Sequence, residues 1–284
     1  MPEFIPGLEL AGLYYHEAVK PILLRHYPDL VHSAGLIGTG SEVLGFDDEM
    51  STDHSWGPRA ILFLSEQEHA WVADKLRLTL GQELPFSFRG YSTHFEAVPD
   101  EPGAVVPAET DNRPINHTVR ITVLSEFLQH YVGTPLEEEP TVLDGLTIPG
   151  QKLRSLVAGA VVHDGLGVLR PMQRKLAYYP HEVWLYLLSA QWRRIGQEEP
   201  FVGRTGWVGD EAVSAIIESR LVRDLMHLCM LMDKKYVPYS KSFGSDFGQL
   251  DCEDRLTPVL KGVLAATAWR ERERHLCAAY EMVA

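Results

Sequence analysis

Short apolar runs and amphipathic segments alternate along the first half of the chain. Four stretches have the length and apolar character of strands: 30–38, 59–64, 86–98 and 117–124. Three others carry apolar side chains at helical spacing: 8–27, 65–81 and 125–133. Ser65 followed by Glu68 is typical of a helix N-terminus, so the helix over 65–81 follows the strand over 59–64 directly. The pattern predicts helices packed on a sheet.

After a last apolar stretch at 156–169, helical spacing continues almost to the end of the chain. Three long helices are predicted, over 180–199, 210–236 and 256–283. A mixed region followed by helices is typical of two domains. The predicted fold class is α/β (α+β), with a mixed sheet in an N-terminal domain of residues 1–170 and an all-α domain of residues 171–284.

Composition and charge narrow the functional classes. The chain has 284 residues, 45% of them hydrophobic, which is enough for a large core. Its formal net charge of -13, with no cluster of Lys and Arg, disfavours nucleic acid as a partner. The three cysteines have neither disulfide-framework nor zinc-site spacing. With no signal-like or membrane-spanning stretch, a cytoplasmic protein is expected.

The stretch between the first two predicted strands carries candidate chemistry. Gly40 permits close backbone approach, and the Ser41 hydroxyl and amide are suited to a phosphate oxygen. Asp53, after eleven intervening residues, is expected at the mouth of the second strand, where a carboxylate holds a divalent cation that bridges phosphates. This combination indicates metal-assisted nucleotidyl transfer.

These residues resemble a known family. Gly-Ser, a spacer and Asp-x-Asp on the second strand form the signature of the nucleotidyltransferase superfamily related to DNA polymerase beta. The chain is similar to a bacterial branch close to the antibiotic adenylyltransferases, through GSEVLGFDDEMSTDHSWGPR (40–59) and a second box, YVPYSKSFGSDF (236–247). The resemblance implies a nucleoside triphosphate, ATP, with Mg²⁺ as cofactor and a small-molecule hydroxyl as acceptor. It implies that Gly40 and Ser41 grip the triphosphate.

Ser55 departs from the family pattern. Asp53 and residue 55 would be the metal ligands by resemblance, and active members have a second carboxylate where this chain has serine, a far weaker ligand for a hard cation. Three interpretations stay open: a ligand from elsewhere, a changed reaction, or a nucleotide-binding or regulatory protein that has lost catalysis. Asp47 and Asp48 either fold back over the loop as ligands or form a solvated turn.

The family also has a third carboxylate that serves as metal ligand or general base. The candidates are Glu96, on a predicted strand, and Asp164, before a glycine at a strand end, and each is also explained as a surface or turn residue. Arg59, at the start of an apolar strand, is expected to pair with a nearby aspartate.

Further phosphate-binding candidates come from the helical half. Lys241 and Tyr239, in the second box, are expected in a loop, where lysine acts as a point charge on the triphosphate or is a plain surface residue. Arg204, in a predicted loop over 203–211, is a candidate for phosphate or a carboxylate acceptor, and Asp210 is expected to cap the following helix.

Overall fold

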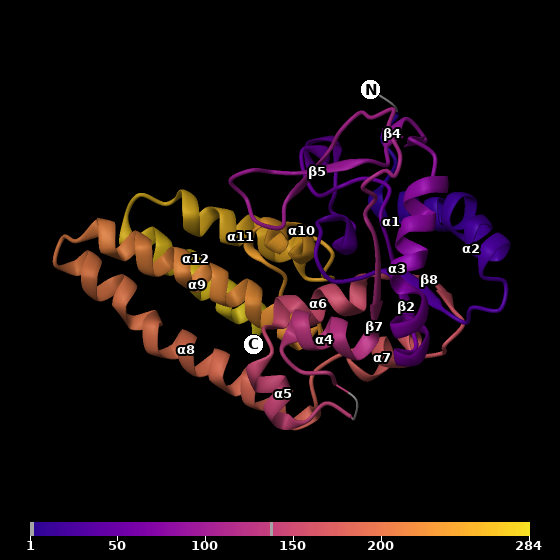
Figure 1. Ribbon diagram of the computed structural model, residues 1–284. Helices are drawn as coiled ribbons and strands as arrows, with labels where there is room; N and C mark the ends of the chain where they lie inside the picture. The colour runs from indigo at the N-terminus through magenta and orange to yellow at the C-terminus, as the bar shows by residue number, and fades with distance from the viewer. Residues whose placement is uncertain (1–2, 137–138) are drawn as a thin grey trace. The chain divides into compact units, whose positions relative to one another are not determined.

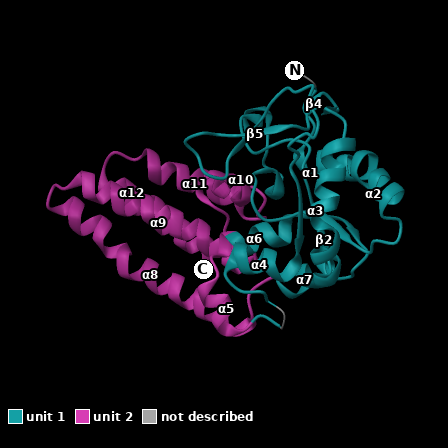
Figure 2. Cartoon of the chain, in the orientation of Figure 1, with its two compact units in different colours: residues 1–140, 152–177 teal, residues 141–151, 178–284 magenta. Residues whose placement is uncertain are grey.

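A computed structural model describes residues 3–136 and 139–284 of the chain. The described residues form two compact units, which Figure 2 distinguishes by colour. Unit 1 comprises residues 1–140 and 152–177, and unit 2 comprises residues 141–151 and 178–284. No helix in the described part of the chain combines the length and apolarity needed to cross a membrane.

A four-stranded mixed sheet forms the centre of unit 1 (Figure 1). Its strands, in the order β7-β2-β1-β8, are β1 (Ser33–Leu36), β2 (Ala60–Leu64), β7 (Val119–Val123) and β8 (Ala160–Asp164). β2 is parallel to β7, and β1 is antiparallel to both β2 and β8. The end of β1 therefore shares one edge of the sheet with the beginnings of the other strands. We call this the Gly40 edge, because the loop that carries Gly40 leaves β1 there.

Helices cover both faces of this sheet. They are α1 (Gly7–Tyr14), the π-helix η1 (Tyr15–Val19), α2 (Lys20–His26), α3 (Glu66–Glu83), α4 (Leu124–Val132), α6 (Gly150–Ala158), which begins in unit 2, and α7 (Leu169–Lys175), with short 3₁₀ turns η2 (Glu42–Leu44) and η3 (Glu49–Thr52). Leu62 belongs to the same buried cluster as Leu10 of α1 and Leu76 of α3. Phe63, its neighbour on β2, packs edge-to-face against Phe127 of α4 at 5.5 Å between ring centroids. Because successive strand residues point to opposite faces, burial on both sides explains the unbroken apolar run of β2.

Local signals place most of these elements as predicted. The Ser65 side chain accepts the Glu68 N–H at 3.2 Å and caps α3, as expected. The predicted strand over 86–98 is instead three short strands, β3 (Ser87–Phe88), β4 (Tyr91–Ser92) and β5 (Phe95–Ala97). β3 and β4 form one hairpin, and β5 forms a second with β6 (Val105–Pro107). Arg89 and Gly90 both adopt positive φ, which turns the chain where the apolar pattern continued.

Unit 2 is helical. Its elements are α5 (Val142–Thr147), α8 (His181–Trp207), α9 (Glu211–Met232), η4 (Ser240–Ser242), α10 (Phe243–Phe247), α11 (Glu253–Ala265) and α12 (Trp269–Val283). A core that includes Ile195, Leu221, Leu260 and Leu276 joins the four longest helices. The predicted helix over 256–283 is two helices, since the chain is extended at Ala266 and Ala268.

Helix α8 is longer than predicted. It continues through Pro200 to Trp207, so the predicted loop over 203–211 is helical for most of its length. Val202 and Gly206 are buried beyond the proline, and their packing outweighs the hydrogen bond that proline removes. The prediction for Asp210 is confirmed, because its carboxylate accepts the Val213 N–H at 3.1 Å and caps α9.

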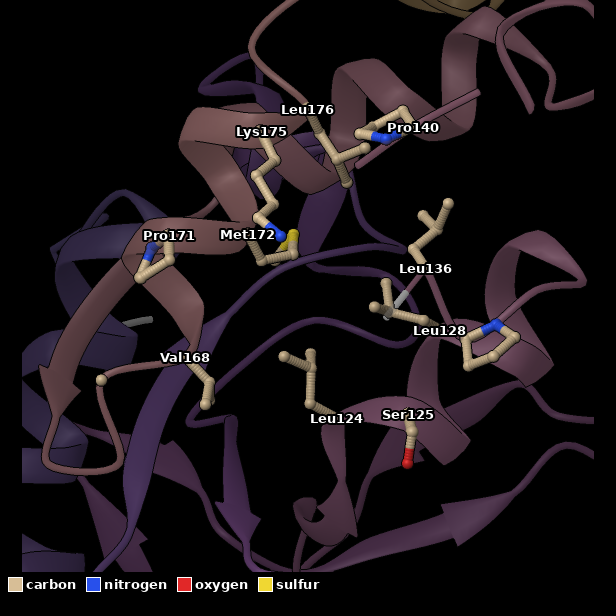
Figure 3. A pocket seen from close by; sticks show the side chains of 12 residues that line it. Leu124, Ser125, Leu128, Leu136, Pro140, Val168, Pro171, Met172, Lys175 and Leu176 are labelled. Carbon is tan, nitrogen blue, oxygen red and sulfur yellow. The ribbon is translucent and has the colours of Figure 1, made fainter. Parts of the chain in front are cut away.

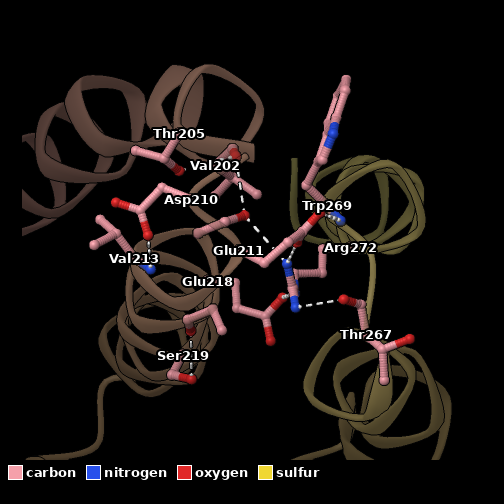
Figure 4. A network of polar contacts seen from close by, with 12 residues as sticks. Val202, Thr205, Asp210, Glu211, Val213, Glu218, Ser219, Thr267, Trp269 and Arg272 are labelled. Atoms are coloured by element: carbon pink, nitrogen blue, oxygen red, sulfur yellow. Dashed lines mark hydrogen bonds and ion pairs between the residues drawn. The ribbon is translucent and has the colours of Figure 1, made fainter. Parts of the chain in front are cut away.

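A buried polar network joins α9 to α12 (Figure 4). The Arg272 guanidinium, almost fully buried, lies 2.8 Å from Glu218 Oε2 and forms a second ion pair with Glu211. It also donates to the Thr267 carbonyl at 3.1 Å. Two carboxylates thus share one guanidinium in the helical core.

Candidate functional site

The loop after β1 is shaped by its glycines. Gly40 has a φ of +135°, and a methyl group built on its Cα would collide with the Glu42 carboxylate. Only glycine meets both conditions without strain. Ser41 follows in a helical conformation, and its side chain does not cap η2. The Gly-Ser pair therefore adopts a tight turn beside a buried carboxylate.

Arg59 joins the two ends of the first sequence box. Its guanidinium pairs with Glu42 at 3.1 Å, donates to the Thr39 carbonyl at 2.9 Å and also donates to the Ser55 carbonyl. The prediction that Arg59 pairs with an aspartate is wrong, because its partner is Glu42, a buried glutamate of η2. The ion pair holds the Gly40 loop against the start of β2.

Asp53 lies in the loop before β2 and not on the strand. It ends η3, its side chain is exposed, and its Oδ1 accepts the His54 N–H at 2.9 Å and lies 3.0 Å from the His54 ring nitrogen Nδ1. The His54 ring contact lowers the pKa of the Asp53 carboxyl. Asp53 is therefore an ionised carboxylate in solvent.

Ser55 is fixed by the β5–β6 hairpin. It has a φ of +51°, which is uncommon for a residue other than glycine. Its N–H donates to the Val105 carbonyl at 2.6 Å, and its Oγ accepts the Val105 N–H at 3.3 Å. The serine hydroxyl thus has a structural partner.

In the described part of the chain, the carboxylates near Ser55 do not gather into a preformed metal site. In the described residues no group of three or more His, Cys, Asp or Glu side chains comes close enough to hold a metal ion. Asp47 accepts the Trp56 indole N–H at 2.9 Å and the Gly7 N–H at 2.7 Å, and Asp48 caps η3. Both aspartates therefore have local structural roles, and neither replaces the carboxylate absent at Ser55.

The two candidates for a third carboxylate lie apart from the Gly40 loop. Asp164 ends β8 at the opposite edge of the sheet, where it accepts the Ser33 hydroxyl at 2.8 Å and three backbone N–H groups at the start of α7. These donors outweigh burial and lower the pKa of its carboxyl. Glu96 is exposed on β5, 3.9 Å from His94. These contacts agree with the alternative interpretations of the sequence, in which Asp164 is a turn residue and Glu96 is a surface residue.

The remaining candidates belong to unit 2. Lys241 is exposed on η4, and Tyr239 precedes it with a partly exposed ring. Arg204 is not in a loop, because it lies in the last turn of α8 with its guanidinium 5.8 Å from the centre of the Phe201 ring.

A cavity of about 580 Å³ opens at the Gly40 edge. Residues from the loop after β1, the starts of β2 and β7, and helices α4 and α6 line it. Three of them are cationic, Arg59, Arg120 and Lys152, and no acidic residue lines it in the described part of the chain. Ser55 of the first box and Thr39, the residue just before that box, also contribute. We call this the cationic cavity.

Aromatic rings hold two of these cations in place. The Arg120 guanidinium lies 5.1 Å from the centre of the Phe127 ring, and Lys152 Nζ lies 5.4 Å from that of Tyr131. Lys152 also donates to the Tyr131 carbonyl. Neither Arg120 nor Lys152 forms an ion pair with a carboxylate that the structure describes. Both positive charges are therefore available to an anionic ligand.

Sequence reasoning missed Arg120, Tyr131 and Lys152. Arg120 alternates with buried residues on β7, which reads as an ordinary surface position, and Lys152 lies on a helix that was not predicted. The signal for Arg120 was its place at the beginning of a predicted strand, at the same edge as Arg59. No local pattern distinguishes Lys152.

A second cavity, of about 300 Å³, lies toward the opposite edge of unit 1 (Figure 3). Apolar side chains from α4 and α7, such as Leu124, Leu128 and Met172, line most of it. Lys175 at its rim lies 3.4 Å from Glu139. It contains none of the residues that the sequence singled out.

Comparisons with known proteins add little to this geometry. A family model described as "Domain of unknown function (DUF4037)" matches residues 146–242. No curated protein matches the chain. The crystal structure of a nucleotidyltransferase-like protein from Exiguobacterium sibiricum 255-15 is similar over 94% of this chain and 73% of that one, at 9% identity and a TM-score of 0.40. A similarity of that degree carries no argument about function, so the expectation of a nucleotidyltransferase rests on the resemblance of the two sequence boxes.

Proposed function

We propose that this protein binds a nucleoside triphosphate such as ATP, with its phosphates in the cationic cavity, and that it lacks metal-dependent transfer. The observation that carries the proposal is the set of three cations in a cavity without a lining carboxylate. The sequence resemblance supplies the nucleotide, and the cavity supplies the charge for its phosphates. A volume of about 580 Å³ suits a ligand of that size.

The cations differ in how much charge they offer. Glu42 neutralises much of the charge of Arg59, which therefore mainly shapes the loop. The Arg120 guanidinium can donate two parallel hydrogen bonds to phosphate oxygens, and the Lys152 ammonium group acts on them as a point charge. The rings of Phe127 and Tyr131 already restrict these two side chains. Ligand binding therefore costs less side-chain conformational entropy than it would at an open surface.

Calorimetry with ATP tests the proposal. We expect Arg120→Ala and Lys152→Ala each to weaken binding by about 10- to 100-fold, the effect of losing a hydrogen bond to a charged group. Arg274→Ala and Lys261→Ala, exposed residues of α12 and α11, are the matched controls and should leave affinity unchanged. Affinity should persist in EDTA and fall with added salt. Binding that needs magnesium, or that the cavity variants leave intact, would contradict the proposal.

The second candidate is nucleotidyl transfer to a small-molecule hydroxyl. The order Gly40, Ser41, Asp53 favours it, and in that reaction the phosphate-binding roles of Tyr239, Lys241 and Arg204 stay predictions. We expect the wild type to release no pyrophosphate from any nucleoside triphosphate with magnesium, since Ser55 is held by Val105. Turnover that appears only in Ser55→Asp would establish a lost activity. Turnover by the wild type, abolished in Asp53→Asn, would establish a transferase.

A further inference from the structure

A third cavity of unit 1, of about 400 Å³, is lined by aromatic rings. Phe4, Trp56 and Tyr91 come from three segments: the N-terminal segment, the loop before β2, and β4. Glu49 and Thr52 of η3 complete one side. We call it the aromatic cavity. It shares no described lining residue with the cationic cavity.

The three rings form an ordered cluster. Phe4 stacks on Trp56 at 5.7 Å between ring centroids and 20° between planes, and Tyr91 meets Trp56 edge-on at 5.0 Å and 72°. The Trp56 indole N–H donates to Asp47 at 2.9 Å, which fixes the ring. A carboxylate acceptor on that N–H also polarises the indole and enriches the electron density on its faces. The cavity wall is thus rigid and electron-rich.

The charged residues that line the cavity also favour a positively charged ligand. Glu49 is its one titratable carboxylate, and no Lys, Arg or His lines the cavity in the described part of the chain. Ring faces and a carboxylate both attract positive charge. Glu49 repels an anionic ligand, whereas a cation gains charge attraction from Glu49 that a neutral ligand lacks.

We propose that the aromatic cavity binds a small organic cation, a quaternary or substituted ammonium group. The partly exposed rings of Phe4 and Tyr91 contact its alkyl groups, the buried Trp56 ring packs behind them, and Glu49 supplies the counter-charge. Cation–π contact with the rings and attraction to the Glu49 carboxylate are the interactions by which this lining would recognise a cation. This inference is independent of the proposed nucleotide site.

The test compares choline with 3,3-dimethylbutan-1-ol, its neutral isostere with carbon in place of nitrogen. Titrations are followed by the tryptophan indole N–H signals in ¹H–¹⁵N spectra of the full chain, with Trp56 assigned through Trp56→Phe. We expect choline to bind at least about tenfold more tightly than the alcohol. Glu49→Gln and Tyr91→Leu should each weaken choline binding severalfold, while Glu126→Gln and Tyr186→Leu, exposed residues elsewhere, should not.

Equal affinity for the neutral alcohol would overturn the proposal and leave a plain apolar cavity. So would choline binding that both cavity variants retain, or the lack of saturable binding at millimolar choline. Circular dichroism checks that Tyr91→Leu folds. If it does not, Glu49→Gln decides, because Glu49 is exposed and its side chain forms no hydrogen bond or ion pair with the residues that the structure describes.

Discussion

Buried charge at the first sequence box is concentrated in Glu42 and Arg59. Their ion pair lies against Gly40, and Arg59 also ties Thr39 and Ser55 together. Removing one member of a buried pair leaves the other without compensation, which destabilises far more than loss of a surface pair. The Gly40 loop therefore depends on Glu42 of η2, a residue of the first box to which the sequence pattern assigned no role.

Glu42→Gln should lower the free energy of unfolding by about 3 kcal/mol, since it removes the buried carboxylate that neutralises the partly buried Arg59 guanidinium. Urea denaturation measures this. Glu66→Gln, at an exposed position in the first turn of α3, is the control and should change it by less than about 1 kcal/mol. If the two variants were equally stable, the ion pair would contribute nothing to the fold.

Close approach of helices in unit 2 depends on single glycines. A methyl group built on Gly206 of α8 would collide with the Trp269 side chain of α12, whereas one built on Gly196, in the same helix, would meet open space. The two positions have the same helical backbone and differ only in what packs against them.

Gly206→Ala should destabilise the protein by roughly 1–3 kcal/mol, because overpacking outweighs the higher helix propensity of alanine. Gly196→Ala should stabilise it by up to about 1 kcal/mol for the propensity alone. Thermal unfolding of both variants checks this pair. Stabilisation by both would mean that α12 moves aside at no measurable cost.

Prediction at the element scale succeeded where local signals decide. The Ser65 cap, the apolar runs of β1 and β2 and the Asp210 cap were all readable from neighbouring residues. Pro200 inside α8 was not, since proline is a local breaker that only buried contacts beyond it overcome. The predicted mixed sheet followed by helices is confirmed.

Over the whole molecule, the two units contain titratable groups that respond to pH in opposite ways. In unit 1, His32 and His163 lie 4.8 Å apart between ring centroids, with Tyr15, Lys20, His16 and Asp164 around them. Burial lowers the pKa of both histidines. In unit 2, burial raises the pKa of Glu218 to about 7; the Arg272 charge lowers this pKa and the Glu211 charge raises it, and burial is the largest effect.

The stability of unit 1 should fall as pH drops below about 6.5, where the unfolded chain binds protons that folded His32 and His163 resist. Above that pH both rings are neutral in either state and the effect vanishes. His163→Gln should make the stability of unit 1 depend less on pH below about 6.5. His69→Gln, on α3 outside the cluster, should leave that dependence unchanged. Hydrogen exchange of sheet amides between pH 5 and 7, corrected for intrinsic rates, gives the comparison.

Unit 2 should behave in the reverse sense. The folded state holds the Glu218 proton up to about pH 7, whereas the unfolded chain releases it near 4.5, so stability falls between these values as pH rises. The slope is at most about 1.4 kcal/mol per pH unit. Hydrogen exchange of the α9 and α12 amides should show this loss of stability with rising pH, and the Glu218→Gln variant should not show it. A slope unchanged in the variant would assign the effect to another group.

The sequence by itself determined the mixed sheet followed by helices and several of the individual strands, helices and caps, because caps and apolar periodicity act within a few residues. Only the tertiary structure decided which side chains meet. Strand direction sends Asp164 to the far edge, and the β5–β6 hairpin occupies Ser55. Arg120 and Lys152 reach one cavity from elements distant in the chain. Such meetings depend on strand register and helix packing, which no local pattern encodes.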